Sequence, residues 1–126
     1  MADPGLPVVL VVDDNDDTRA MYAHLLKSAG FEVKLAADGD EALAAAADDR
    51  PGVIIMDLAM PGLNGWEATR RLKTGERTKD IPIIVLTAHA LDHYRDVAIA
   101  AGCDAFLSKP CAIEDLVAAV RRLLER

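Results

Sequence analysis

The stretch VIIMDLAMPG, which spans Val53–Gly62, decides how the rest of this chain is interpreted. Four apolar residues lead into a single carboxylate, Asp57, and a proline–glycine turn follows soon after. A short apolar run bounded in this way is typical of a strand that is buried on both faces. Asp57 then lies at the carboxyl end of that strand, which is the edge where open α/β sheets bind their ligands. Taken alone, this carboxylate could be a metal ligand, a nucleophile or a helix cap.

Length and composition limit what the chain can be. Its 126 residues fit one domain, and an apolar content of 52% is enough to bury a core. The net charge of −7 argues against a nucleic acid or a membrane surface as a direct partner, because both require basic patches. No apolar run approaches the ~20 residues of a membrane span. We expect Cys103 and Cys111 to be free thiols in a reducing cytoplasm rather than a disulfide.

Predicted strands and helices alternate along the chain. We expect strands over residues 8–12, 31–36, 53–56, 81–86 and 105–107, and helices over about 16–29, 38–47, 64–72, 91–102 and 113–124. Such alternation predicts an α/β fold with a parallel sheet and helices on both faces. The strand at 31–36 alternates apolar and polar residues, so we place it at an edge. The result is a doubly wound five-stranded sheet of order 2-1-3-4-5, as in flavodoxin-like folds. In the first helix, we expect Thr18, Met21, Leu25 and Leu26 to share one face.

Polar side chains stand at the carboxyl ends of four of these strands: Asp13 and Asp14, then Asp57, Thr87 and Lys109. The strand ends of a parallel sheet lie on one side, so these side chains can converge on one pocket. Crowded carboxylates repel each other and need a cation, and oxygen ligands favour Mg²⁺. A hydroxyl and an ammonium aimed at the same point suit a phosphoryl group. Singly, the acids or the threonine could be helix caps and the lysine could be solvated, but their joint placement favours a magnesium site with one carboxylate free to be phosphorylated.

The motifs that carry these residues resemble those of one known family. Asp-Asp at 13–14, Met-Asp-Leu-x-Met-Pro at 56–61, Leu-Thr-Ala at 86–88 and Ser-Lys-Pro at 108–110 are similar to the motifs of the receiver domain of two-component response regulators. The resemblance extends from Val8 to Leu124. It implies that Asp57 is the phosphoacceptor. It also implies that Mg²⁺ is held by Asp13, Asp14, Asp57 and the backbone carbonyl of Ala59.

The resemblance assigns further roles around the phosphoryl group. It implies that Thr87, Ala88 and Lys109 bind the phosphoryl oxygens and that Thr87 and Phe106 form the conformational switch. Phe106 has no hydroxyl, so its part in the switch can act only through packing. The Lys109–Pro110 bond resembles the cis peptide of the family, which proline permits at low cost.

The same resemblance implies a mode of action. A histidine kinase or a histidine phosphotransfer protein would donate the phosphoryl group to Asp57, and an unknown downstream protein would recognise the changed surface. The chain would be a switch rather than an enzyme, with one receiver domain over residues 6–126 and no output domain. We expect the donor to approach the start of the first helix, where Ala20 and Ala23 are predicted to be exposed beside Asn15 and Arg19.

Two other classes of protein remain as alternatives. Asp14-x-Asp16-x-Thr18 after a strand resembles the nucleophile motif of haloacid dehalogenase-type phosphatases, with Asp14 as nucleophile and Asp16 as acid. That interpretation leaves Asp57 without a role, and no later strand supplies the second acidic pair of those enzymes. The chain could also be an interaction module that is never phosphorylated. Replacing Asp57 with Asn separates all three interpretations.

Overall fold

The structure is a computed structural model that describes residues 6–57, 65–87, 96, 99–109 and 111–125. Its elements in chain order are β1 (Val8–Val12), α1 (Asp16–Ser28), β2 (Glu32–Ala36), α2 (Gly39–Asp49), β3 (Val53–Met56), α3 (Gly65–Thr74), β4 (Ile83–Thr87), β5 (Ala105–Ser108) and α5 (Ile113–Leu124). The helix predicted over residues 91–102 falls mostly outside the described residues. Among the helices that are described, none combines the length and apolar character that crossing a membrane requires.

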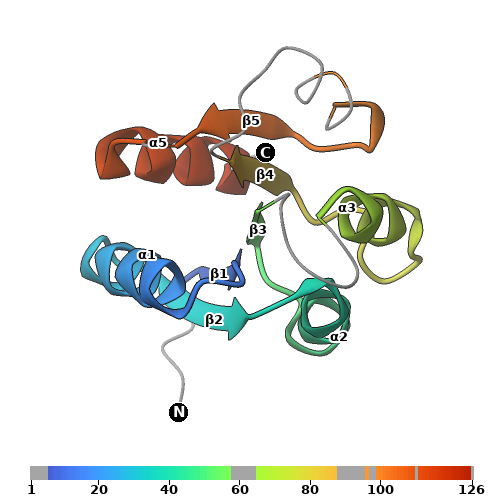
Figure 1. Ribbon diagram of the computed structural model, residues 1–126, viewed down its shortest axis with the longest axis horizontal. Helices are drawn as coiled ribbons and strands as arrows, with labels where there is room; N and C mark the ends of the chain where they lie inside the picture. Colours follow the sequence, from blue (N-terminus) through green and yellow to red (C-terminus); the bar gives the residue numbers. More distant parts are fainter. Residues whose placement is uncertain (1–5, 58–64, 88–95, 97–98, 110, 126) are drawn as a thin grey trace.

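The five strands form one parallel sheet in the order β2-β1-β3-β4-β5. This confirms the predicted flavodoxin-like order and the edge position of β2. Helices α1 and α5 cover one face of the sheet, and α2 and α3 cover the other (Figure 1). Every residue of β3 and β4 is buried, as expected of central strands that carry helices on both faces.

Strand alternation divides the core into two layers. In β1, Val9 and Val11 pack on the side of α1 and α5, whereas Leu10 and Val12 pack on the side of α2 and α3. The strand cannot slip by one residue without exchanging these two sets of contacts. The register of β1 against its neighbours is therefore fixed, and so is the position of the residues that follow it.

Side-chain caps set where the helices begin. Asn15 accepts the N–H of Thr18 at the start of α1. A capping box is present in a modified form at the start of α2. Asp38 accepts the N–H of Glu41, and the Glu41 carboxylate accepts the N–H of Ala37 rather than that of Asp38.

The predicted inward face of α1 was wrong at one position. Met21 is 48% exposed, whereas Tyr22 is 6% exposed and Leu26 is fully buried. The buried face of α1 therefore runs through Tyr22 and Leu26, which are four residues apart, and Met21 lies outside it. Tyr22 replaces the more apolar Met21 in the core because its ring packs in the same cluster as Val9 and Leu116.

Candidate functional site

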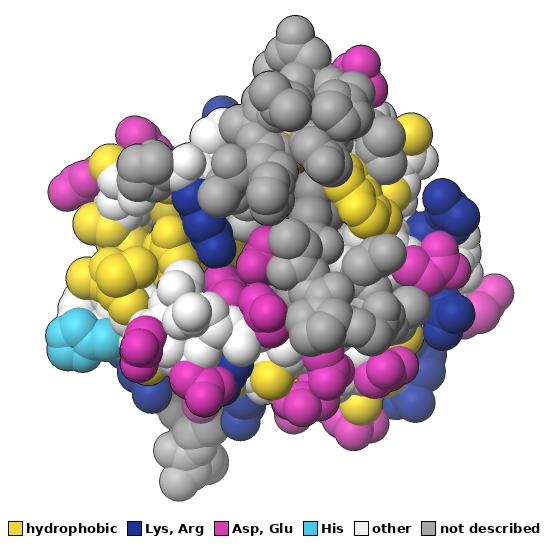
Figure 2. Space-filling model, viewed as in Figure 1, with side chains coloured by type: hydrophobic (Ala, Val, Ile, Leu, Met, Phe, Trp, Pro, Cys, Tyr) yellow, Lys and Arg dark blue, Asp and Glu magenta, His cyan; other side chains and the backbone are white. Residues whose placement is uncertain are grey.

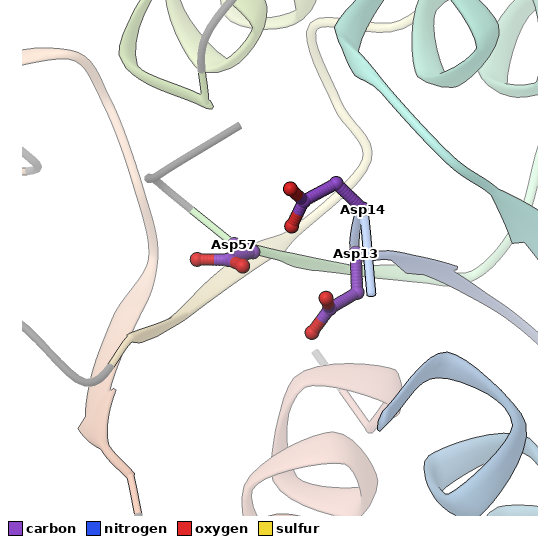
Figure 3. Close-up of side chains that lie close together, drawn as sticks. All are labelled: Asp13, Asp14 and Asp57. Atoms are coloured by element: carbon purple, nitrogen blue, oxygen red, sulfur yellow. The ribbon is translucent and has the colours of Figure 1, made fainter. Parts of the chain in front are cut away.

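Three carboxylates meet where β1 and β3 end. Asp13 and Asp14 follow β1, Asp57 follows β3, and one oxygen from each lies within 4.8 Å of the others (Figure 3). The sheet itself aligns them, because Val12 is paired with Met56 and the next residues emerge side by side. Backbone bonds continue past the strands: Asp57 N–H donates to Val12 at 3.1 Å and Asp13 N–H donates to Ala36 at 3.1 Å. Figure 2 shows acidic side chains at the centre of this face of the molecule.

Two of these carboxylates are largely removed from solvent. The side chain of Asp13 is 5% exposed and that of Asp57 is 12% exposed, whereas Asp14 is exposed. One oxygen of Asp13 accepts the backbone N–H of Asn15 at 2.9 Å, which fixes that carboxylate in place. The cluster thus has two largely buried acids, of which Asp13 is held by a hydrogen bond, and one acid that faces water.

Lys109 supplies a positive charge beside the acids. Its Nζ lies 3.0 Å from Asp13 Oδ2 and 3.9 Å from Asp57 Oδ2. Its backbone N–H donates to the carbonyl oxygen of Thr87 at 2.8 Å, so the ends of β4 and β5 set its position. Burial by itself lowers the pKa of Lys109, but the hydrogen bond to Asp13 and the charge of Asp57 outweigh that effect and raise the pKa above its usual value. The ammonium therefore stays charged at neutral pH.

The donor set and the charge balance fit a hard divalent cation. Three carboxylates against one ammonium leave an excess of two negative charges, and all the clustered donors are oxygens. Asp13, Asp14 and Asp57 are thus able to hold Mg²⁺, and Lys109 is placed to bind an anion next to it. This is the chemistry that the sequence pattern predicts for these strand ends.

Thr87 and Phe106 lie on adjacent strands near the cluster. Thr87 is the last residue of β4 and is fully buried. Phe106 is paired with Val85, packs against it together with Trp66 and Cys103, and is half-buried. Phe106 is also among the residues that line a pocket of about 140 Å³, together with Ile99 and Cys103. Cys103 and Cys111 are free thiols, as predicted.

Several predicted site residues lie outside the described part of the chain. These are Ala59, Ala88 and Pro110, so the carbonyl ligand, the additional phosphoryl contact and the cis peptide stay predictions. The predicted docking face at the start of α1 was wrong for Ala23, which is 6% exposed because it lies on the inward side of the helix. Ala20 is exposed, as predicted.

Two residues of α1, Arg19 and Tyr22, make contacts at the site that the sequence did not predict. Arg19 donates from Nη1 to the carbonyl oxygen of Asp13 at 2.8 Å and pairs with Asp16; its place on a docking surface stays a prediction. Tyr22 lies under Lys109, with 5.9 Å between Nζ and the ring centroid. Burial raises the pKa of Tyr22, and the Lys109 charge only partly offsets this, so the phenol is neutral. The spacing of four residues from Thr18 to Tyr22 to Leu26 was the available signal for an inward Tyr22.

Comparison with known proteins gives one consistent result. The sequence profile of the response regulator receiver domain matches residues 9–121. The response regulator MprA of Mycolicibacterium vanbaalenii is 44% identical over 123 residues, which are 96% of this chain and 52% of that protein. MprA of Mycobacterium tuberculosis H37Rv is 44% identical over 119 residues, which are 94% and 50% of the two chains. The chain spans about half the length of these curated relatives.

Two solved structures extend the comparison to three dimensions. The chemotaxis protein CheY4 of Vibrio cholerae is 37% identical with a TM-score of 0.88, and the match covers 94% of this chain and 99% of that one. The receiver domain of the sensor histidine kinase PA1611 from Pseudomonas aeruginosa is 34% identical with a TM-score of 0.90, covering 97% and 100%. That receiver domain was solved with a magnesium ion coordinated in its active site cleft.

Proposed function

This chain belongs to the response regulator receiver domain family, and from that premise we propose that Asp57 accepts a phosphoryl group from a histidine kinase or a histidine phosphotransfer protein. A phosphoryl-accepting signalling role is general to the family. The observation that carries the choice of residue is the position of Asp57, which shares the acidic cluster with Asp13 and Asp14 and has Lys109 Nζ at 3.9 Å. The 12% exposure of its side chain leaves a narrow approach for a donor.

The residues that would hold Mg²⁺ are Asp13, Asp14 and Asp57, with the carbonyl oxygen of Ala59 as a further ligand. When bound, the cation neutralises the carboxylates and allows an anionic donor to approach them. Lys109 is already charged and lies beside the acids, so it can receive a phosphoryl oxygen without having to gain a proton. Thr87 would offer its hydroxyl, and Ala88 its backbone N–H, to the remaining oxygens.

In the transfer step, a carboxylate oxygen of Asp57 attacks the phosphorus of a phosphohistidine. The new P–O bond forms as the P–N bond breaks, and the electron pair of that bond stays on the imidazole nitrogen of the donor. Hydrolysis reverses the modification: water attacks the phosphorus, the P–O bond to Asp57 breaks, and inorganic phosphate leaves with release of a proton. The chain therefore acts as a resettable switch and not as an enzyme on a separate substrate.

The conformational change would spread from the acceptor site to the surface of the domain. Thr87 would move towards the phosphoryl group, and Phe106 would turn into the space that Thr87 leaves. We assign residues 6–126 to this receiver domain. A downstream protein partner would recognise the altered face.

The phosphatase alternative receives no support from Asp16. That acid pairs with Arg19, and its side chain is 87% exposed. It does not belong to the acidic cluster, whereas Asp57 does. A catalytic acid directed at Asp14 would need the opposite arrangement.

The test is labelling by a small phosphodonor such as phosphoramidate in the presence of Mg²⁺. Asp57→Asn should abolish the labelling, while Asp16→Asn, a matched change at a neighbouring acid, should leave it unchanged. Mass spectrometry of the parent should place the label on Asp57. Full labelling of Asp57→Asn, or loss of labelling in Asp16→Asn alone, would exclude Asp57 as the acceptor.

A further inference from the structure

The ring of Tyr22 forms a wall beside the ammonium of Lys109. Nζ lies 5.9 Å from the ring centroid, within the range of a cation–π contact. Tyr22 comes from the second turn of α1, is 6% exposed, and packs in the same core cluster as Leu26 and Leu116. The wall is therefore rigid, because moving the ring would disturb the core beneath it.

Lys109 needs such support more than the acids do. Its side chain has four rotatable bonds and remains 19% exposed, so it can adopt several positions. Among the described residues, its acidic neighbours are Asp13 and Asp57, and their charge balance changes when a cation binds or when Asp57 is modified. The face of the Tyr22 ring attracts a cation in every one of these states, since the ring is neutral and takes no part in them.

We propose that Tyr22 is a positioning residue for Lys109, keeping its ammonium at the acceptor site while the carboxylates around it change their charge. The inference rests on the proposed function, in which Lys109 receives a phosphoryl oxygen. The aromatic ring and not the hydroxyl carries the effect, because the phenol makes no hydrogen bond to any residue in the described part of the chain. Phenylalanine should therefore replace tyrosine here, and leucine should not.

The first experiment compares rates of Asp57 labelling by phosphoramidate in the parent, Tyr22→Phe and Tyr22→Leu. Tyr22→Leu should slow the labelling by about 2- to 30-fold, the range that one cation–π contact supports. Tyr22→Phe should restore the rate to within about two-fold of the parent, because the ring is retained. In a Lys109→Gln background, Tyr22→Leu should cause no further slowing, since a residue that acts through Lys109 has no effect without it.

Phe31, which lies just beyond the C-terminal end of α1, provides a matched control. Phe31 is 5% exposed, belongs to the same core cluster, and has Arg121 over its ring at 5.8 Å, but it precedes β2 at the opposite edge of the sheet. Phe31→Leu should lower stability without changing the labelling rate. Equal slowing by Phe31→Leu, slowing by Tyr22→Phe as large as by Tyr22→Leu, or persistence of the Tyr22→Leu effect in Lys109→Gln would each overturn the proposal.

A second measurement is independent of phosphorylation. The ring current of Tyr22 should shift the ¹H resonances of the Lys109 ε-methylene upfield, and this shift should persist in Tyr22→Phe and vanish in Tyr22→Leu. If Tyr22→Leu does not fold, Tyr22→Met gives the same comparison. If the parent shows the shift but takes no label, the contact exists and the proposed function is wrong. If the parent does not show the shift, the positioning role is wrong.

Discussion

The ion pair between Lys73 and Asp104 stabilises the end of the sheet where the strands begin, which lies opposite the acidic cluster. Lys73 lies in the last turn of α3, and its Nζ donates to Asp104 Oδ2 at 2.9 Å and to the carbonyl oxygen of Ile81 at 3.0 Å. The same oxygen of Asp104 accepts the backbone N–H of Ile83 at 2.8 Å. The pair thus ties α3 to the starts of both β4 and β5.

We expect Asp104→Ala to lower the free energy of unfolding by about 2–4 kcal/mol, because it leaves a mostly buried ammonium without its charge partner. The side chains of Lys73 and Asp104 are 18% and 16% exposed, so the loss should fall below that of a fully buried pair. Asp104→Asn should cost about half as much, since the amide oxygen can still accept the N–H of Ile83.

Urea unfolding followed by circular dichroism measures this loss directly. With a slope of roughly 1.5–2 kcal/mol per molar, Asp104→Ala should lower the midpoint by about 1–2 M at an unchanged slope. Lys73→Met and the double variant complete a thermodynamic cycle, in which the coupling energy should be about 1–3 kcal/mol. A loss under ~0.5 kcal/mol for Asp104→Ala, or strict additivity in the cycle, would refute the view that this pair stabilises the sheet edge.

Three further outcomes follow from single positions. The buried Thr69 hydroxyl has no hydrogen-bond partner among the described residues, so Thr69→Val should raise the free energy of unfolding by up to about 1–2 kcal/mol in thermal or urea melts; a decrease would contradict this. The pKa of Lys109 is raised, so its contribution to stability is complete below pH 10.5 and is lost as the pH rises through the folded-state pKa. Lys109→Met should therefore flatten the alkaline fall in the free energy of unfolding, measured with a chelator present. A steeper fall in the variant would count against this. Ala20 is exposed next to the site, so Ala20→Glu should slow transfer from a cognate kinase but spare labelling by phosphoramidate; equal slowing of both would argue against docking there.

The fold could be predicted from the sequence because its signals are strong and agree with one another. Continuous apolar runs at β1, β3 and β4 indicate buried parallel strands, and the alternating pattern of β2 indicates an edge. The convergence of Asp13, Asp14, Asp57 and Lys109 followed from the same argument, since parallel strands end on one side. A site built on strand ends is thus more predictable than one built on loops.

Other parts of the site were not predicted, because they depend on how helix α1 is rotated about its axis and the spacing that favours Tyr22 competes with the greater hydrophobicity of Met21. Adjacent helical residues point about 100° apart, so hydrophobicity alone favoured Met21 over Tyr22 as the inward residue. Tyr22 is buried because its ring has a place between the core and Lys109. The same rotation buries Ala23 and brings Arg19 to the carbonyl oxygen of Asp13.

The burial pattern also limits how a signal could leave the acceptor site. All five residues of β4 are buried between two helical layers, so a large shift of this strand would disrupt both parts of the core. Phe106 on β5 is only half-buried and is among the residues that line a pocket of about 140 Å³, so a change of its rotamer would disturb fewer core contacts than a shift of β4. If Thr87 moves towards a phosphoryl group as proposed, a side-chain rearrangement on β5 is therefore the change that disturbs the core least. The frame of the sheet would stay fixed, and the acidic cluster, Lys109 and its Tyr22 wall would keep their geometry through the cycle.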